Sequence, residues 1–529
     1  MRELTPFLAE NGETPGIGRV TMFAMNTHLL TDQCYCAIEQ DDARYDGLFF
    51  TAVLTTGIFC RPTCTAQTPR AENVRFFATA AAAAEAGFRP CLRCRPETAP
   101  EYPTSYTLSP LVSQGLQQIA AGVLDEHGVE ELAQRLHVSS RQLRRLFVDE
   151  LGAPPVAIAQ TRRLLFAKQL IDETQLPMTD VAYSAGYTSL RRFNTAIYQT
   201  YGRTPSELRG SRYNRKYQRP DDWVQLRLYY RPPYHWRSML RFLQQRAIPG
   251  VEVVDGLIYR RLHRFADRQG IVEVEAMPNE AYLLVRVEPA LARNLLPITE
   301  RVKQLFDLRA DPMAIANQFA DDEVLGRLVH GYPGVRVPGA WDGFETAVRL
   351  ILGQQISVKA ATTLAGKLVA AYGEPIGDPD QPNTVRPNTV QPNIGGALTH
   401  HFPTPQVLAD ADLAALGMTK RTAQTIQRFS RALCDGSLTL QRAPSLEETL
   451  DQLTALPGIG AWTANCIAMR VMGEVDAFPA GDLILRRALS LDPKGAVSEA
   501  ALLTHATAWQ PFRAYAAMLL WTHYAEQTR

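Results

Sequence analysis

The spacing of apolar residues changes several times along this chain of 529 residues. From about residue 108 to 209 they recur three and four positions apart, which predicts a helical unit interrupted at Gly128, at 152–155 and at Pro177. The next stretch has short strand-like runs at 223–230, 256–262, 271–276 and 281–287, with one helical run at 235–247. Helical spacing returns from about residue 295. A chain of this length accommodates about three to five domains.

These changes divide the chain into segments and predict a multidomain α+β protein. Residues 1–30 show no sustained periodicity, so we expect a disordered N-terminal extension. A low-complexity stretch near 375–403 contains QPNTV, RPNTV and QPN at a period of five, and such sequence cannot bury a core. The expected parts are a small α/β domain at 31–100, an all-α unit at 108–215, a small α/β subdomain at 224–305 and an all-α domain at 306–529.

Composition indicates in which cellular compartment the protein works and what kind of partner it binds. No run of 18 apolar residues and no signal-peptide pattern occurs, so we expect a cytoplasmic protein with no membrane contact. The net charge is only +1, but residues 203–246 hold eleven Lys or Arg against Glu207, Asp221 and Asp222. That local excess fits contact with DNA phosphates, and equally a solvated basic surface.

Four of the eight cysteines have the spacing of a zinc site. Cys60 and Cys64 form one short pair, and Cys91 and Cys94 form a second pair 26 residues later. Two short pairs supply the four corners of a closed tetrahedral thiolate site. Four unrelated buried thiols have no reason to pair in this way, and eight cysteines are too few for a disulfide scaffold in a chain of this length. We expect one Zn²⁺ and no organic cofactor.

The sequence around these cysteines resembles the N-terminal domain of the Ada adaptive-response proteins. The matching stretches are TTGIFCRPTC, RAENVRFF and AGFRPCLRCRPE, within about 35–96. The resemblance implies that Cys60 is both a zinc ligand and the acceptor of a methyl group from a DNA methylphosphotriester. Methylation would turn one thiolate into a neutral thioether and reduce the repulsion of phosphate. Arg61, Arg89 and Arg93 are candidate phosphate partners.

The all-α unit carries two helix-turn-helix patterns. In VEELAQRLHVSSRQLRRLF, a Ser N-cap precedes a helix that presents Arg141, Arg144 and Arg145. In the second, Gly186 marks the turn and the next helix carries Arg191, Arg192 and Asn194. This second segment resembles the closing signature of AraC-type regulators. Two such helices would contact successive major-groove segments of a promoter operator, with RNA polymerase as a further partner, whereas a helical hairpin unrelated to DNA is the alternative.

The last domain contains a helix-hairpin-helix pattern followed by an aspartate. Residues 456–460 read LPGIG, and Gly458 and Gly460 let backbone N–H groups approach a DNA phosphate. Asp482 lies twenty residues after Trp462, behind a Gly/Pro-rich stretch. Together these features indicate a hairpin-type DNA glycosylase. A buried carboxylate would stabilise positive charge on the sugar, and aromatic faces would hold an extruded cationic base.

From about residue 226 the chain resembles the AlkA-type methyladenine glycosylases. The resemblance rests on YYRPPYHWRSMLRFLQQRA, FDLRADP, ILGQQISV and WQPFRAYAAMLLW. It implies that Asp482 is the catalytic carboxylate, that Trp462 and Trp521 line the base pocket, and that Gln354 lies beside the lesion. Trp462 stands where strand-nicking relatives carry a lysine, so the implied activity is monofunctional. Three residues depart from the pocket and wedge pattern: Cys466, Leu483 and Gln355.

Two functional classes follow from these patterns. The first is an alkylation-damage response protein that excises alkylated bases from double-stranded DNA, accepts a methyl group on Cys60 and activates repair genes. The alternative is a transcription regulator whose glycosylase-like half only binds DNA. Asp482, the hairpin and both tryptophans together favour the enzyme. No Pro-Cys-His-Arg motif is present, so repair of alkylated guanine by a second acceptor domain is not predicted.

Overall fold

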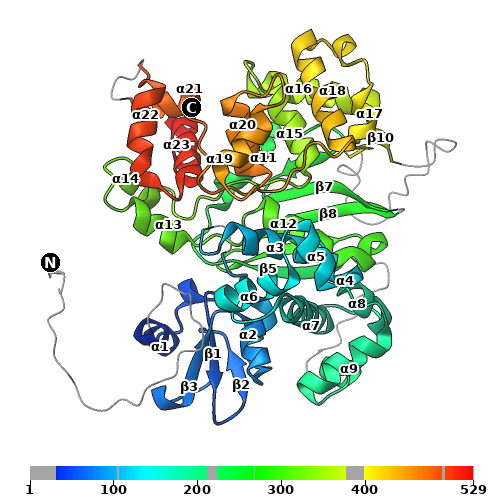
Figure 1. The fold of residues 1–529 in the computed structure, drawn as a ribbon, viewed down its shortest axis with the longest axis vertical. Coiled ribbons are helices and arrows are strands. Elements are labelled where there is room, and N and C mark those ends of the chain that lie inside the picture. Colours follow the sequence, from blue (N-terminus) through cyan, green and yellow to red (C-terminus); the bar gives the residue numbers. More distant parts are fainter. Residues whose placement is uncertain are drawn as a thin grey trace.

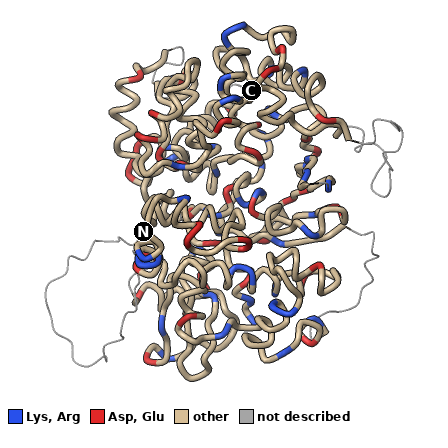
Figure 2. The backbone as a smooth tube through the Cα atoms, turned by 45° about the vertical axis from the view of Figure 1, so that its right-hand side comes forward, with Lys and Arg blue, Asp and Glu red and all other residues tan. Residues whose placement is uncertain are grey.

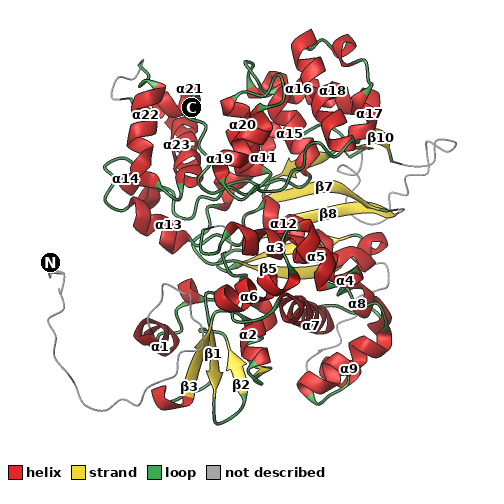
Figure 3. Cartoon of the chain, viewed as in Figure 1, coloured by secondary structure: helices red, strands yellow, loops and turns green. Residues whose placement is uncertain are grey.

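A computed structural model describes residues 31–103, 106–210, 223–266, 268–376, 398–490 and 495–527 (Figures 1 and 3). The expected N-terminal extension and the repeat at 381–393 lie outside these residues. The mixed α+β fold expected from the sequence is confirmed. Within the described residues, no helix is both long and apolar enough to cross a bilayer.

The first part, which we call the cysteine domain (residues 31–103), is built on a small sheet. Its strands run in the order β3-β1-β2-β4, antiparallel except for the parallel pair β2 and β4. Thr79 caps the alanine-rich helix that follows β3, because its side chain accepts a hydrogen bond from the N–H of Ala82. The elements are α1 (Thr31–Glu39), β1 (Phe50–Val53), β2 (Ile58–Cys60), β3 (Val74–Phe77), α2 (Ala80–Glu85) and β4 (Arg89–Pro90).

The second part, the helical unit (residues 106–210), contains two similar halves joined by a long helix. The elements are α3 (Pro110–Ala120), α4 (Val123–Glu126), α5 (Val129–Arg135), α6 (Ser140–Leu151), α7 (Pro155–Glu173), α8 (Met178–Ser184), α9 (Leu190–Tyr201) and α10 (Pro205–Gly210). The pairs α5–α6 and α8–α9 are the two helix-turn-helix motifs expected from the sequence. Glycines with positive φ, Gly152 and Gly202, end α6 and α9.

The third part is an antiparallel sheet with strand order β5-β9-β8-β7-β6. Alternating burial along β5 (Val224–Tyr229) follows the period-two pattern of its sequence. The other elements are α11 (Trp236–Arg246), β6 (Glu252–Asp255), β7 (Ile258–Phe265), β8 (Arg268–Ala276) and β9 (Tyr282–Val287). The sequence pattern gave no sign of β6, because this edge strand has only four residues.

The remaining part, the helical core (residues 289–527), is almost entirely α-helical. Its helices are α12 (Leu295–Leu305), α13 (Pro312–Phe319), α14 (Leu325–Gly331), α15 (Gly343–Leu352), α16 (Val358–Tyr372), α17 (Pro405–Ala409), α18 (Lys420–Cys434), α19 (Leu446–Thr454), α20 (Ala461–Arg470), α21 (Leu483–Ala488), α22 (Glu499–Ala506) and α23 (Arg513–Gln527). The short strands β10 (Glu374–Pro375) and β11 (His400–His401) pair across the residues that are not described. They form the base of the stretch expected near 375–403.

The two halves of the chain share one apolar core. A single cluster of buried residues includes Phe166 of α7, Phe193 of α9, Leu226 of β5 and Ile298 of α12. The edge of β5 is covered by α7, because Gln169 donates to the carbonyl of Arg227 at 2.8 Å and Glu173 accepts from its N–H at 3.0 Å. An open sheet edge is thereby satisfied by side chains of the helical unit. The helical unit and the second sheet are therefore packed together rather than joined only by a flexible linker.

Arg231 ties three parts of the chain together at the centre of this unit. Its guanidinium is fully buried and donates to the main-chain carbonyls of Asp46 (3.1 Å), Glu101 (2.8 Å) and Arg309 (2.6 Å). The first two carbonyls belong to the cysteine domain and the third to the helical core, while Arg231 itself follows β5 of the second sheet. Arg231 therefore does not contribute to a DNA-binding surface, although it belongs to the basic stretch 203–246. Figure 2 shows basic and acidic positions interspersed over both halves of the chain.

We expect Arg231→Met to destabilise the full-length protein by about 3 kcal/mol. Methionine fills much of the space but leaves three buried carbonyls without their donor. Urea denaturation of the whole chain, followed by fluorescence, measures the change. Arg237→Met is the matched control, because Arg237 is exposed on α11 and its loss should cost no more than about 0.5 kcal/mol. Equal midpoints for the two variants would show that the Arg231 contacts do not hold the parts together.

Candidate functional site

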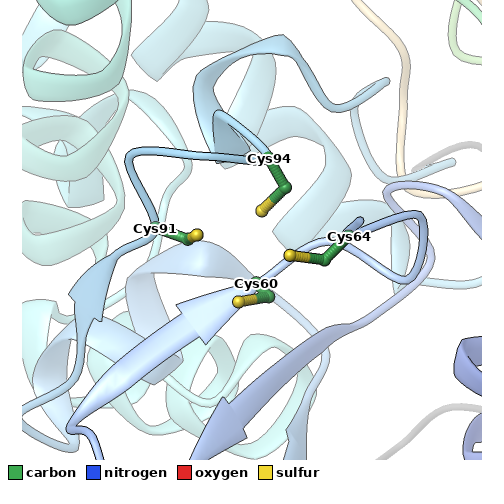
Figure 4. Close-up of side chains that lie close together, drawn as sticks. All are labelled: Cys60, Cys64, Cys91 and Cys94. Carbon is green, nitrogen blue, oxygen red and sulfur yellow. The ribbon is translucent and has the colours of Figure 1, made fainter. Parts of the chain in front are cut away.

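The four cysteines that the sequence pairs by spacing come together at one end of the first sheet (Figure 4). Cys60 ends β2 and Cys91 directly follows β4. The parallel pairing of β2 with β4, extended by a hydrogen bond from the Cys91 N–H to the Phe59 carbonyl at 2.9 Å, brings the two pairs side by side. All four Sγ atoms lie within 4.8 Å of one another. Four sulfurs about 2.3 Å from one zinc ion would lie about 3.8 Å apart, so the cluster fits this ion.

Backbone N–H groups also point at the sulfur atoms. The N–H of Arg61 donates to Cys94 Sγ and that of Arg93 to Cys91 Sγ, each at 3.4 Å. Such donors stabilise the negative charge of thiolate ligands. The protein therefore binds one Zn²⁺ through Cys60, Cys64, Cys91 and Cys94, as expected from the sequence.

We expect elemental analysis of the purified chain to find about one zinc per molecule. Cys91→Ser should lower the zinc content and loosen the cysteine domain, because metal binding supplies folding free energy to a small domain. Cys434→Ser is the control, since Cys434 is exposed on α18 and lies outside the cluster. Wild-type protein without zinc, or equal zinc loss in both variants, would contradict this assignment.

The three arginines beside the cysteines differ in their surroundings. The Arg61 guanidinium forms an ion pair with Asp46, donates to Thr98 Oγ1 at 2.5 Å and lies over the Tyr229 ring at 5.6 Å. It is engaged inside the protein and is not a free phosphate donor, unlike the expectation from sequence. Arg89 and Arg93 are exposed. They remain the candidates for phosphate contact at this site.

The six side chains predicted to meet DNA on the helix-turn-helix motifs are all exposed. Ser139 and Ser189 begin α6 and α9 as N-caps, accepting hydrogen bonds at 3.2 Å and 3.3 Å. The apolar face of each helix, such as Leu143 and Phe147 on α6, is buried in the unit. The opposite face therefore carries the predicted side chains: Arg141, Arg144, Arg145, Arg191, Arg192 and Asn194.

The helix-hairpin-helix joins α19 to α20, and the structure shows what glycine does at two positions of this turn. Gly458 has φ of +103°, and a Cβ there would lie 2.0 Å from Thr425 Oγ1. Gly460 is the N-cap of α20, which leaves the first N–H groups of this helix without side-chain caps. Gln354 donates to the carbonyl of Gly458 at 3.0 Å and to Thr463 Oγ1 at 2.9 Å. The turn after α15 is thus fastened to the hairpin.

Asp482 is held by four N–H donors. It is the N-cap of α21, where Oδ1 accepts from the N–H groups of Ile484 at 2.9 Å and Leu485 at 3.1 Å. Oδ1 also accepts from the indole N–H of Trp521 at 3.2 Å, and Oδ2 accepts from that of Trp462 at 3.0 Å. Residues that lie 20 and 39 positions from Asp482 therefore converge on its carboxylate. This arrangement fixes a negative charge at one point, and within the described residues no ion pair uses this carboxylate.

One charged side chain near Asp482, Arg246, was not singled out from the sequence. Arg246 of α11 lies over the Phe242 ring, with its Cζ atom 3.8 Å from the centroid. Burial and the neighbouring Arg349 lower the pKa of Arg246 to about 10, and Cys466 and Asp482 act in the opposite direction. Arg246 belongs to the stretch 229–247, which resembles the AlkA-type enzymes, but the helical period of that stretch does not reveal which of its side chains lie near Asp482. Leu483 is exposed at the start of α21, Gln355 is exposed in the turn between α15 and α16, and Cys466 is buried.

The two indoles give a further prediction. Trp521→Phe keeps an aromatic ring but removes the N–H bonded to Asp482 Oδ1, so we expect about tenfold slower base release with DNA affinity nearly unchanged. Single-turnover rates and binding to the same duplex separate the two effects. Trp509→Phe is the control, because its indole N–H bonds to Asp322 at 2.7 Å instead of Asp482. If both variants release base at the wild-type rate, the Trp521 N–H does not position the carboxylate.

Comparisons with known proteins give family matches to four successive ranges of the chain. Four family models match in order: the metal binding domain of Ada (residues 33–97), a helix-turn-helix domain (132–211), the AlkA N-terminal domain (225–342) and the HhH-GPD superfamily of base excision DNA repair proteins (348–494).

Individual relatives match nearly all of the chain or a part of it. A probable bifunctional transcriptional activator/DNA repair enzyme AlkA of Mycobacterium tuberculosis is 41% identical over 93% of this chain and 96% of its own length. DNA-3-methyladenine glycosylase 2 of Escherichia coli is 32% identical over 56% of this chain and 95% of its own. The bifunctional transcriptional activator/DNA repair enzyme AdaA of Bacillus subtilis is 32% identical over 35% of this chain and 85% of its own.

Proposed function

The chain belongs to the family of AlkA-type bifunctional transcriptional activators and DNA repair enzymes, and we propose how its residues perform the two activities. The helical core is a DNA glycosylase that removes alkylated bases of the 3-methyladenine type. The cysteine domain accepts a methyl group from a damaged DNA phosphate and controls binding of the helix-turn-helix motifs to a promoter. The observation that carries the glycosylase assignment is the convergence of two indole N–H groups and a helix N-terminus on Asp482.

In base excision, the bond between the sugar C1′ and the base nitrogen breaks, and its electron pair leaves with the base. An alkylated purine carries positive charge, so it becomes neutral on leaving, and positive charge develops on the sugar. The fixed Asp482 carboxylate stabilises that charge. Water then adds its hydroxide to C1′ and releases a proton, which leaves an abasic site. Trp462 cannot form a Schiff base with the sugar, so strand cleavage is not part of the reaction.

The base pocket differs from one lined only by aromatic rings. Trp462 and Trp521 offer faces for stacking, whereas Cys466 is small and Arg246 brings a positive charge near Asp482. Gln355, with φ of +60°, occupies the turn expected to fill the gap left by the extruded base.

Methyl transfer is assigned to Cys60. The Cys60 sulfur attacks the methyl carbon of a phosphotriester, an S–C bond forms, and the C–O bond breaks with its electron pair going to the phosphate oxygen. Bound zinc would keep the thiols deprotonated while leaving sulfur nucleophilic. Cys60 is only 9% exposed, and Cys64 and Cys94 are more open to solvent. The assignment of Cys60 as the acceptor is supported by the match to the metal binding domain of Ada.

The control of DNA binding by methylation would follow from the change in net charge at the zinc site. Four thiolates and one Zn²⁺ sum to −2, and methylation of one sulfur leaves −1, so phosphate is repelled less. At a distance of about 4 Å, one unit charge changes the interaction energy with a phosphate charge by about 1 kcal/mol in water and by about 4 kcal/mol at an effective dielectric near 20. Exposed Arg89 and Arg93 lie next to this site and would contact the phosphate. A promoter-bound protein of this kind would act on RNA polymerase.

One experiment tests both activities. Zinc-loaded protein is incubated with DNA treated with a methylating agent, the released bases are identified by chromatography, and the protein is mapped by mass spectrometry. We expect free 3-methyladenine and one methyl group on Cys60. Protein that binds this DNA but releases no base would favour the alternative, a regulator whose glycosylase-like half only binds DNA.

A further inference from the structure

An arginine directly follows the first cysteine of the zinc site, and another follows the last. Arg61 comes after Cys60 and Arg95 after Cys94, and only 13% and 20% of their side-chain surfaces are exposed. Both guanidinium groups are therefore engaged inside the protein rather than offered to a DNA phosphate. The partners of these two groups show which elements hold the zinc site in place.

Arg61 connects the two cysteine pairs. Its main chain belongs to the segment 60–64 that carries the first pair, and its N–H donates to Cys94 Sγ at 3.4 Å. Its guanidinium donates to the Cys94 carbonyl at 3.4 Å and to Thr98 Oγ1 at 2.5 Å, both in the segment that carries the second pair. A change in the position of this guanidinium would therefore move the two pairs relative to each other.

The second half of the chain, from β5 onward, completes the surroundings of Arg61. The ring centroid of Tyr229, the last residue of β5, lies 5.6 Å from the Cζ atom of Arg61. Asp46, which forms the ion pair with Arg61, is itself held by Arg231, which donates to the Asp46 carbonyl at 3.1 Å. A cation over an aromatic face is attracted by the ring, and more strongly where both groups are shielded from water. The position of the Arg61 guanidinium thus depends on β5 and the residues that follow it.

The same strand supports Arg95. Its guanidinium pairs with Asp172 at 3.2 Å and with Glu173 at 3.1 Å, both near the end of α7. Glu173 also accepts from the N–H of Arg227 in β5 at 3.0 Å. Arg95 has φ of +57°, a conformation that residues other than glycine rarely adopt and that surrounding contacts must hold. The second cysteine pair is thus connected to β5 through α7.

From these contacts we propose that β5 is a functional part of the methyl-acceptor site and that Tyr229 is a positioning residue for methyl transfer. Tyr229 holds Arg61, and Arg61 holds the cysteine pairs in the arrangement in which Cys60 Sγ can align with the methyl carbon and the phosphate oxygen that leaves. Displacement at carbon requires these three atoms to be nearly collinear, so a small rotation of the Cys60 side chain slows the reaction. This inference rests on the proposed methyl transfer to Cys60. It makes the transfer dependent on the half of the chain that excises bases.

Replacement of Tyr229 tests the proposal. Zinc-loaded full-length protein is mixed with an excess of a short duplex that contains one methylphosphotriester, and mass spectrometry follows the methyl group on Cys60 with time. Tyr229→Leu removes the aromatic face, and we expect the maximal rate of transfer to fall about twofold to thirtyfold. The DNA concentration that gives half of this rate should change little, because Tyr229 acts on the reacting sulfur and not on DNA binding. Tyr229→Phe keeps the face and should transfer the methyl group at close to the wild-type rate.

Zinc retention gives a second measurement that does not depend on methyl transfer. Tyr229→Leu should release zinc to a colorimetric chelator faster than the wild-type protein does, because the two cysteine pairs are held together less firmly, whereas Tyr229→Phe should not. Tyr183→Leu is the matched control: the Tyr183 ring pairs with Arg293 at 6.0 Å, so this variant loses a similar contact elsewhere. It should transfer the methyl group and retain zinc as the wild-type protein does.

The outcomes separate this inference from the proposed function. Wild-type protein that gains no methyl group on Cys60 would contradict the proposed function itself. If the wild-type protein transfers the methyl group and Tyr229→Leu does so at the same maximal rate, the role of Tyr229 is refuted. Tyr229→Phe as slow as Tyr229→Leu would refute it as well, since the aromatic face would then be irrelevant. Base release from the same samples shows that the second half of each variant is folded; if Tyr229→Leu lacks it, the more adaptable Tyr229→Met takes its place in the same comparison.

Discussion

Replacing Asp482 by asparagine should slow excision of 3-methyladenine at least about a hundredfold, equivalent to about 2.7 kcal/mol of barrier. Asparagine keeps the shape and remains a good N-cap for α21. Its oxygen can still accept from the N–H groups of Ile484 and Leu485, but its amide would face the indole N–H of Trp462, where Oδ2 now accepts. The negative charge that stabilises the sugar cation is lost, so the effect should fall on the chemical step.

Single-turnover excision, paired with binding to the same DNA, measures this effect. Asp342→Asn is a matched control, because Asp342 is also an N-cap aspartate, with its side chain bonded to the Glu345 N–H at 2.9 Å. Both variants should bind DNA nearly as the wild-type protein does, and only Asp482→Asn should lose activity. An Asp482→Asn protein that excises near the wild-type rate would refute the mechanism given above.

Replacing Cys60 by serine should abolish methyl transfer altogether. A serine hydroxyl keeps its proton near neutral pH and is a far poorer nucleophile than a zinc-bound thiolate. Excision of alkylated bases should persist, because Asp482 belongs to a different part of the chain. Mass spectrometry after incubation with methylated DNA detects the transfer, and base release from the same sample reports on the glycosylase.

Cys434→Ser should still accept one methyl group, which controls for the general loss of a cysteine. Cys64 and Cys94 are more exposed than Cys60, so either of them is an alternative acceptor that this test distinguishes from Cys60. If Cys60→Ser still becomes methylated at Cys64 or Cys94, then one of these residues, rather than Cys60, is the acceptor. If base release is lost together with methyl transfer, the two activities depend on each other through the shared core.

The sequence by itself determined the features that depend on local spacing. Helical and strand periods located nearly all elements of the second sheet and the helical unit, with the four-residue edge strand β6 as an exception. The spacing of Cys60, Cys64, Cys91 and Cys94 was sufficient to predict the zinc site, because each short pair supplies adjacent corners of a tetrahedron. Likewise, the hairpin glycines and the distance to Asp482 are set within about thirty consecutive residues. The roles of the individual site residues remain predictions.

Contacts between residues far apart in the chain could be decided only by the tertiary structure. Arg231 and Arg61 both occur in stretches suited to phosphate contact, yet Arg231 is buried against the Asp46 carbonyl 185 positions away, and Arg61 pairs with the side chain of Asp46. The bonds from Trp462 and Trp521 to Asp482, and the place of Arg246 near it, likewise depend on how separate helices pack. Whether a basic side chain contacts water or a buried acceptor depends on which helix or strand packs over it. Local periodicity carries no information about that helix or strand, because it comes from a distant part of the chain.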